Sequence, residues 1–151
     1  MTALFHNYPL MAALLAILMA QFIKVPLFLV MQRSWNPAIA LSTGGMPSSH
    51  SAAVTSLTTA IAWKAGVSST GFAIGVVLSA ITMFDAAGIR RHAGIHATFI
   101  NRLMTVIRDE GQDSHNLPAL KEMLGHRPIE VIAGAIFGIA VSTGLYWLCY
   151  R

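Results

Sequence analysis

The chain has 151 residues, of which 55% are hydrophobic and only 11% are charged, and its formal net charge is +4. Because an ordinary soluble domain carries about 25% charged residues, this composition favours a single membrane-embedded domain, residues 1–151, over a soluble core. The positive excess is small and scattered, which argues against a nucleic-acid partner, and the single Cys149 excludes an internal disulfide or a multi-cysteine metal site.

Four segments are apolar enough to enter a membrane. The first, residues 8–31, has the roughly 20 residues that a crossing needs, although Lys24 interrupts it. The second, residues 48–63, is short and rich in Ser and Thr, so it is expected either to span inside a bundle or to enter partway. Residues 71–89 and 131–150 are predicted spans. The expected fold is an all-α integral membrane bundle with about four membrane helices.

The polar stretch 90–130 separates the last two spans. Residues 92–110 are predicted to form an amphipathic helix, residues 111–118 a turn, and residues 119–126 another short helix. If all four apolar segments cross, this stretch and the loop 33–47 emerge on the same face. The excess of basic residues in the polar stretch then predicts that this face is cytoplasmic.

Small residues in the last span are expected to permit close helix contact, and they are Gly134, Gly138 and Gly144. The aromatic residues that follow them are typical of a membrane interface, and they are Tyr146, Trp147 and Tyr150.

The string "TGGMPSSHSA", residues 43–52, combines a flexible turn with a helix start. Glycines let a backbone approach a ligand closely, and a serine after Pro47 can cap a helix. The N-terminus of such a helix presents free N–H groups that suit a phosphate, and His50 lies in the first turn. A capped helix start with a buried, hydrogen-bonded histidine is the structural alternative.

The string "LKEMLGHRPIEV", residues 120–131, places Glu130 four residues after His126. A carboxylate at this spacing can reach the Nδ1–H of the histidine, fix its tautomer and leave Nε2 free to attack. This is the logic by which an oriented histidine serves as a reactive group. A helix-capping Gly-His followed by an interfacial glutamate remains the alternative.

The string "FDAAGIRRHAGIHA" holds a third group of polar residues at the end of a predicted span. Asp85 is a functional candidate because it lies in or near the membrane, and Arg90 and Arg91 are its expected partners. His92 and His96 share one helical face, a spacing that can bind zinc. A basic cluster that contacts lipid headgroups is favoured for this pair, because the flanking arginines would repel a cation.

Taken together, the first two strings resemble the superfamily of type-2 phosphatidic acid phosphatases and vanadium-dependent haloperoxidases. That superfamily carries Pro-Ser-Gly-His at a helix start and, further on, a histidine followed four residues later by aspartate. Here "MPSSHSA" has Ser49 for the glycine, and "GHRPIEVIAGAIFG" has Glu130 for the aspartate. More closely, the chain is similar to the small, divergent bacterial and plastid branch known as acid phosphatase/vanadium haloperoxidase-related.

The resemblance implies a role for each matching residue. His126 would be the nucleophile that accepts a phosphoryl group, Glu130 would orient it, and His50 would be the general acid. Phosphate oxygens would be held by the following residues: Ser48 and Ser49 with their backbone amides, and the early cations Lys24 and Arg33. Asp85, His92 and His96 would at most support this site. The reaction needs no metal, and no cofactor is expected.

One position departs from the superfamily pattern. An arginine is expected six residues before the nucleophile, where this chain has Leu120. Because phosphoryl transfer depends on neutralising three equatorial oxygens, other cations would have to compensate, and the candidates are Lys121, Arg127, Arg90 and Arg91.

The resemblance implies a lipid phosphatase of a bacterial inner membrane or a plastid-type membrane. It would hydrolyse a phospholipid or prenyl phosphate, either a monoester or a diphosphate, through a phosphohistidine. A protein that binds or transports lipid phosphates without turnover is the first alternative, motivated by Leu120. A metal-handling membrane protein that uses Asp85, His92 and His96 is the second. So small a bundle is also compatible with a homodimer.

Overall fold

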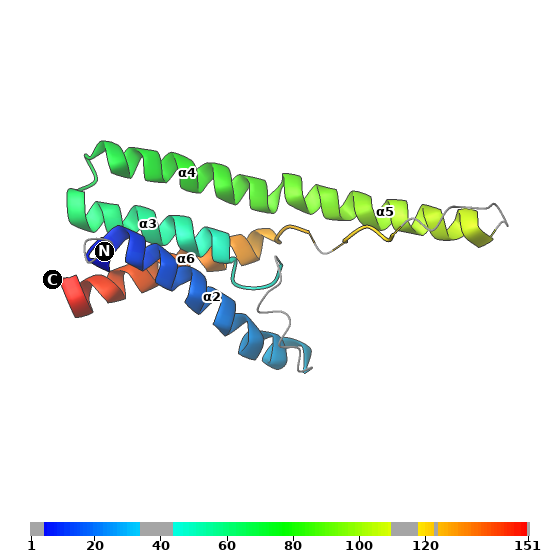
Figure 1. Cartoon of the computed structure of the whole chain (residues 1–151), viewed down its shortest axis with the longest axis horizontal. Helices are drawn as coiled ribbons and strands as arrows, with labels where there is room; N and C mark the ends of the chain where they lie inside the picture. Colours follow the sequence, from blue (N-terminus) through cyan, green and yellow to red (C-terminus); the bar gives the residue numbers. More distant parts are fainter. Residues whose placement is uncertain (1–4, 34–43, 110–117, 123, 151) are drawn as a thin grey trace.

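The computed structural model describes residues 5–33, 44–109, 118–122 and 124–150. The described ranges contain helices and connecting segments but no strand. In chain order the helical elements are α2 (Tyr8–Gln32), α3 (Ser49–Ala65), α4 (Thr70–Ala87), α5 (Ile89–Asp109), α6 (Pro128–Leu145) and the short π-helix η2 (Tyr146–Tyr150). The prediction of an all-α fold is therefore confirmed (Figure 1).

Three helical stretches among the described residues are long and apolar enough to cross a membrane. They are Tyr8–Val30, Thr70–Ile107 and Pro128–Tyr150. The fourth apolar segment of the sequence became α3, which has 17 residues and many hydroxyl side chains. It is shorter than the other three, which agrees with the prediction that this segment is short and either spans inside a bundle or enters partway.

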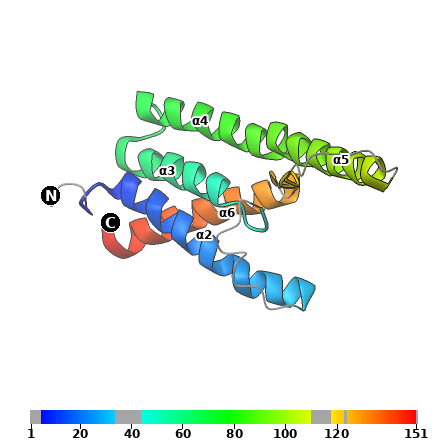
Figure 2. The same cartoon turned by 45° about the vertical axis from the view of Figure 1, so that its right-hand side comes forward.

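Helix α3 lies between α2, α4 and α6 (Figures 1 and 2). Its buried residues are mostly small and polar, and they are Ser49, Ser51, Ala52, Thr55, Ser56, Thr58 and Ala60. The Thr55 hydroxyl donates to Ala135 O of α6 (3.1 Å). The Thr58 hydroxyl forms a hydrogen bond with the Ser79 hydroxyl of α4 (3.0 Å). Because hydrocarbon offers no hydrogen-bond partners, a helix of this composition is stable in a membrane only when its neighbours enclose it.

Helices α3 and α6 approach so closely that two positions on α6 have no room for a side chain. A Cβ at Gly134 would overlap the backbone of Ser48, and one at Gly138 would overlap Ala52 O and the Thr55 hydroxyl. Gly144 differs from the expectation, since a Cβ there would meet nothing within 4 Å. The close contact is therefore confined to the first half of α6.

The two ends of the bundle have different chemistry. At one end, the Tyr8 ring packs on Tyr150 with centroids 4.7 Å apart, and Trp63 stacks on Tyr146 at 5.0 Å. The Tyr8 hydroxyl also donates to Ser142 O (2.9 Å), which ties α2 to α6. Both chain ends lie on this side in Figure 1. The starts of α3 and α6 and the junction of α4 with α5 lie at the opposite, polar end, as the predicted topology requires.

Helix α5 continues in the direction of α4 beyond the rest of the bundle (Figures 1 and 2). The predicted amphipathic helix is therefore present. The predicted short helix over residues 119–126 is not, because residues 118–122 and 124–127 are not helical. The side chain of Asn101 on α5 provides the reason: it accepts from Leu120 N (2.9 Å) and donates to Leu120 O (2.8 Å), and so replaces helical hydrogen bonds. Of the predicted turn 111–118, only Pro118 lies among the described residues.

The contact between α3 and α6 predicts opposite effects of one added methyl group at two glycines. Gly138→Ala forces a Cβ against Ala52 O and Thr55 Oγ1, and overpacking of this kind costs about 1–3 kcal/mol. Gly144→Ala adds the same group in open space, where alanine favours a helix over glycine by up to about 1 kcal/mol. Thermal unfolding in detergent should show a lower midpoint for Gly138→Ala and an equal or higher one for Gly144→Ala. Equal losses at both positions would contradict the close contact.

Candidate active site

His126 lies in the non-helical segment that leads into α6, and it is only 3% exposed. Its backbone N–H donates to Ala86 O at the end of α4 (3.0 Å). The preceding Gly125 has φ = 79°, and a Cβ there would overlap the backbone at the start of α5, at Arg91. Position 125 therefore requires glycine. Pressed against the junction of α4 and α5, the segment holds the His126 backbone in a fixed position.

The contact between His126 and Glu130 is the one that their spacing predicts. Nδ1 of His126 lies 3.0 Å from Oε2 of Glu130, and because a carboxylate only accepts, Nδ1 carries the proton. The same oxygen accepts from Arg127 N (3.2 Å), which caps the start of α6. This arrangement fixes the tautomer that leaves the lone pair on Nε2. Nε2 is buried and has no hydrogen-bond partner among the described residues.

His50 projects from the first turn of α3, beside His126. The two ring centroids are 6.4 Å apart and the planes meet at 63°, close enough for one phosphate group to touch both rings. Desolvation and, next, the positive charge of Arg90 lower the pKa of His50, while Asp85 opposes this shift. His50 is therefore neutral in most molecules at pH 7 and becomes a proton donor as the pH falls.

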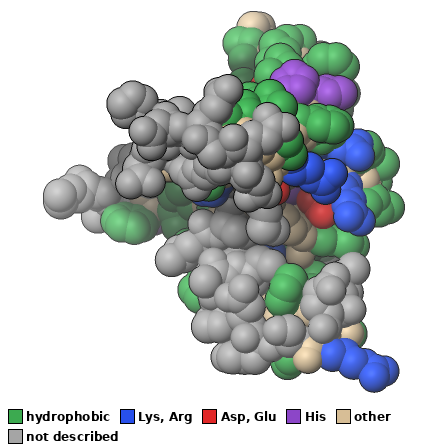
Figure 3. Space-filling view, turned by 90° about the vertical axis from the view of Figure 1, so that its right-hand side faces the viewer, with side chains coloured by type: hydrophobic (Ala, Val, Ile, Leu, Met, Phe, Trp, Pro, Cys, Tyr) green, Lys and Arg blue, Asp and Glu red, His purple; other side chains and the backbone are tan. Residues whose placement is uncertain are grey.

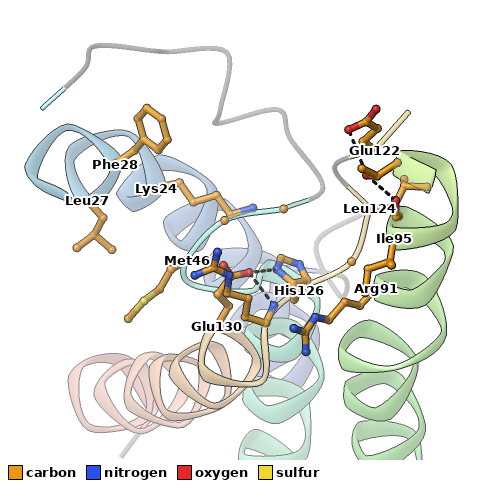
Figure 4. Close-up of a pocket in the computed structure, with 16 residues that line it drawn as sticks. Lys24, Leu27, Phe28, Met46, Arg91, Ile95, Glu122, Leu124, His126 and Glu130 are labelled. Atoms are coloured by element: carbon orange, nitrogen blue, oxygen red, sulfur yellow. Dashed lines mark hydrogen bonds and ion pairs between the residues drawn. The ribbon is translucent and has the colours of Figure 1, made fainter. Parts of the chain in front are cut away.

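Two cavities meet at residues 124–126, which line both. The larger, of about 550 Å³, lies between α2, α5 and the start of α6. Figure 4 shows Lys24, Arg91 and Glu130 reaching toward it from three different helices. Its apolar wall includes Leu27, Phe28, Met46 and Ile95. The smaller cavity, of about 80 Å³, lies on the side of His50 and α4.

The structure separates the candidate phosphate-binding cations into three groups. Lys24, Arg91 and Arg127 line the large cavity, and Arg90 lines the small one. Lys24 is only 1% exposed although lysine is an ionisable residue that is rarely buried. Arg33 and Lys121 line neither cavity. Seen from this end of the molecule, Lys and Arg side chains gather around an acidic side chain (Figure 3).

Ser48 and Ser49 do not line either cavity, although the motif suggests that they hold phosphate. The Ser48 amide donates to Glu130 O (3.0 Å), and its hydroxyl oxygen accepts from Ser51 N (3.3 Å). Ser48 is fully buried and Ser49 is 5% exposed. In this conformation Ser48 joins the starts of α3 and α6, which aligns His50 with His126.

The third polar string forms an ion pair rather than a metal site. Arg90 Nε donates to Asp85 Oδ2 (2.7 Å), while His92 and His96 are exposed on α5 and line neither cavity. Among the described residues, no group of three or more His, Cys, Asp or Glu side chains could hold a metal ion. The geometry therefore gives the metal-handling alternative no support.

One group of residues that holds the segment before His126 was not predicted from the sequence. Glu122 accepts from Asn101 Nδ2 (2.8 Å) and from the Thr98 hydroxyl (3.1 Å). These two hydrogen bonds, that from Asn101 first, lower the pKa of Glu122 and keep it ionised. The spacing of Thr98 and Asn101 on one helical face was the only signal in the sequence.

These observations define an all-helical membrane protein whose polar end holds a histidine–carboxylate pair facing a second histidine. Residues 5–141 match the divergent PAP2 family, and the chain belongs to that family. The resemblance found in the motifs is thereby confirmed.

A curated relative is also a membrane protein. The chain is 45% identical to the uncharacterized membrane protein YuiD of Bacillus subtilis (strain 168) over 148 aligned positions, and the match covers 92% of this chain and 94% of the relative. No solved structure matches the chain. Family and relative together identify a PAP2-related membrane protein.

The hydrogen bonds of Asn101 on α5 to Leu120 and Glu122 predict a local effect of Asn101→Leu. This change removes three hydrogen bonds, two to the Leu120 backbone and one to Glu122. With a net value of about 1 kcal/mol for a typical hydrogen bond, amide exchange at Leu120 should accelerate at least about fivefold. Thr105→Val is the matched control, because the Thr105 hydroxyl bonds Arg102 O on its own helix. An unchanged rate of amide exchange at Leu120 in Asn101→Leu would show that these hydrogen bonds do not hold this segment.

Proposed function

We propose that the protein is a lipid phosphatase that works through a phosphohistidine on His126. The observation that carries this proposal is the His126 ring, which is hydrogen-bonded to Glu130 at Nδ1 and lies beside His50. Its Nε2 is buried and has no hydrogen-bond partner among the described residues. A histidine held in this way is suited to nucleophilic attack, and membership of a PAP2-related family supports phosphorus as the target.

The reaction takes two steps. His126 Nε2 attacks phosphorus, a P–N bond forms, and the bond between phosphorus and the lipid oxygen breaks while protonated His50 gives its proton to that oxygen. Water then attacks the phosphohistidine, and neutral His50 accepts its proton as the P–N bond breaks and phosphate is released. Glu130 stabilises the positive charge on the His126 ring in both steps.

The large cavity supports an amphiphilic substrate over a soluble one. Its volume of about 550 Å³ falls within the range of small-molecule sites. Three basic side chains, Lys24, Arg91 and Arg127, outnumber the two carboxylates in its lining, while α2 contributes the apolar Leu27 and Phe28. A phospholipid or prenyl phosphate offers an apolar chain to this surface and an anionic head that the basic side chains attract toward His126, which lines the same cavity.

A second function, binding of lipid phosphates without turnover, is favoured by two observations. Nε2 of His126 has almost no accessible surface in this conformation, and Leu120 stands at the position of the superfamily arginine, lining neither cavity. The two functions differ in one product, because only the phosphatase forms a phosphohistidine. Rapid acid-free quenching after mixing with a ³²P-labelled lipid phosphate distinguishes them.

Substitutions at His126 and Glu130 test the phosphatase. Phosphate release from phosphatidate and from a prenyl diphosphate, measured in EDTA, should fall to background in His126→Ala. Glu130→Gln should lower kcat by about 100-fold or more, because a glutamine amide can donate to Nδ1 and so place the proton on Nε2, the attacking atom. Lys64→Gln, at the far end of α3, is the control and should retain activity. Release that persists in His126→Ala would refute the proposal.

The lowered pKa of His50 predicts a pH profile that depends on the leaving group. Protonated His50 is present below its pKa, which lies under the ordinary value of about 6.5, and is lost as the pH rises through it. Thus kcat/KM for an alkyl phosphate should fall with rising pH over this window, whereas an aryl phosphate with an acidic phenol should show little fall. His50→Gln should lower kcat/KM for the alkyl substrate about 100-fold and leave kcat/KM for the aryl one largely unchanged, because kcat/KM reports the steps up to departure of the leaving group and not the later attack of water. Identical profiles for both substrates would exclude His50 as the acid.

A further inference from the structure

The small cavity is the one that both histidines line. His50 comes from α3, Asp85 from the end of α4, Arg90 from the start of α5, and His126 from the segment before α6. Its volume of about 80 Å³ corresponds to about three waters, at about 30 Å³ for each. A compact tetrahedral anion is of this size, and a lipid chain is not.

The guanidinium group of Arg90 has N–H donors that no described residue accepts from. Its Nε–H donates to Asp85 Oδ2 (2.7 Å), and this is the one hydrogen bond that the described residues show for the guanidinium. A guanidinium carries five N–H donors in a planar fork, so both terminal amino groups are left for a ligand. Asp85 fixes the plane of the fork at the cavity wall, and its side chain is 34% exposed against 54% for Arg90.

The position of Arg90 bears on the missing superfamily arginine. Leu120 is 47% exposed, and its backbone is held by Asn101 on α5, so no side chain at this position lies against the small cavity. Lys24, Arg91 and Arg127 all lie on the large-cavity side. Arg90 is thus the one Lys or Arg among the described residues that lines the cavity shared by the two histidines.

We infer that the small cavity seats the phosphoryl group, that the terminal amino groups of Arg90 bind its oxygens, and that Asp85 is a positioning residue for Arg90. The inference rests on the proposed function for the identity of the anion. Helix α5 then supplies the cation that position 120 does not. Because Arg90 and Asp85 together carry no net charge, the pair is stable before an anion arrives, and the Nε bond to Asp85 is compatible with the bound state.

Binding of inorganic phosphate to the purified full-length protein, measured by calorimetry in detergent, tests the inference without requiring turnover. Arg90→Gln should raise the Kd for phosphate by about 10- to 100-fold, the value of one or two charge-assisted hydrogen bonds. Arg102→Gln, an exposed arginine further along α5, is the matched control and should leave the Kd unchanged. Phosphate affinity that is lost equally in both variants, or in neither, would overturn the inference, as would a wild-type protein that does not bind phosphate.

Two further variants separate a binding role from a structural one. Added guanidinium ion should restore phosphate binding to Arg90→Ala, which a fold defect would not allow. Asp85→Asn keeps an oxygen acceptor for Arg90 Nε, so it should stay close to wild type in phosphate affinity, whereas Asp85→Ala should lose affinity as Arg90→Gln does. No rescue by guanidinium, or equal losses in the two Asp85 variants, would count against the assignment.

Failure of this inference is distinguishable from failure of the phosphatase. Phosphate binding that depends on Arg90 in a protein that releases no phosphate from lipids would support the small-cavity site and refute turnover. Lipid hydrolysis that depends on His126 but is unchanged in Arg90→Gln would refute the small-cavity site and support turnover.

Discussion

The close contact of α3 with α6 is the constraint on which the candidate site depends. Gly134 and Gly138 bring the two backbones together, and the Ser48 amide bonds Glu130 O at the point where both helices begin. His50 lies two residues after Ser48, and His126 lies four residues before Glu130. Joining the two helix starts therefore places the two histidines side by side, although 75 positions separate them in the sequence.

The membrane explains why so polar a helix as α3 can hold this position. Hydroxyl groups in hydrocarbon must find partners inside the protein, and α3 bonds α6 through Thr55 and α4 through Thr58. These interhelical hydrogen bonds add to packing that uses mainly alanine and glycine, which permit short distances but little apolar burial. These contacts therefore fix the helix starts that carry the candidate site.

Local features were predictable from the sequence, and features that depend on helix rotation were not. The contact between His126 and Glu130 was predicted from their four-residue spacing, although Glu130 makes it by reaching back from the first turn of α6 to the non-helical segment. The apolar segments follow from composition. The short helix predicted over 119–126 failed because Asn101, about 20 residues away, replaces its backbone hydrogen bonds. The sequence also could not show which cavity Arg90 and Arg91 would each line. Adjacent residues on a helix point about 100° apart, and here the two arginines line different cavities.

Two carboxylates, Glu130 and Asp85, lie near His126, and each accepts a hydrogen bond from one side chain of the candidate site. Glu130 accepts the hydrogen bond from Nδ1–H of the histidine, so the lone pair of the ring is on Nε2. Asp85 accepts the hydrogen bond from Nε–H of Arg90, and the terminal amino groups have no acceptor among the described residues. In both pairs the carboxylate binds the side-chain nitrogen that lies closer to the backbone, and this contact orients the outer nitrogen or nitrogens of the same group. In the proposed reaction, each acid is hydrogen-bonded to its own partner, so an arriving phosphate would meet oriented donors and a nucleophile rather than an unpaired negative charge, which would repel it.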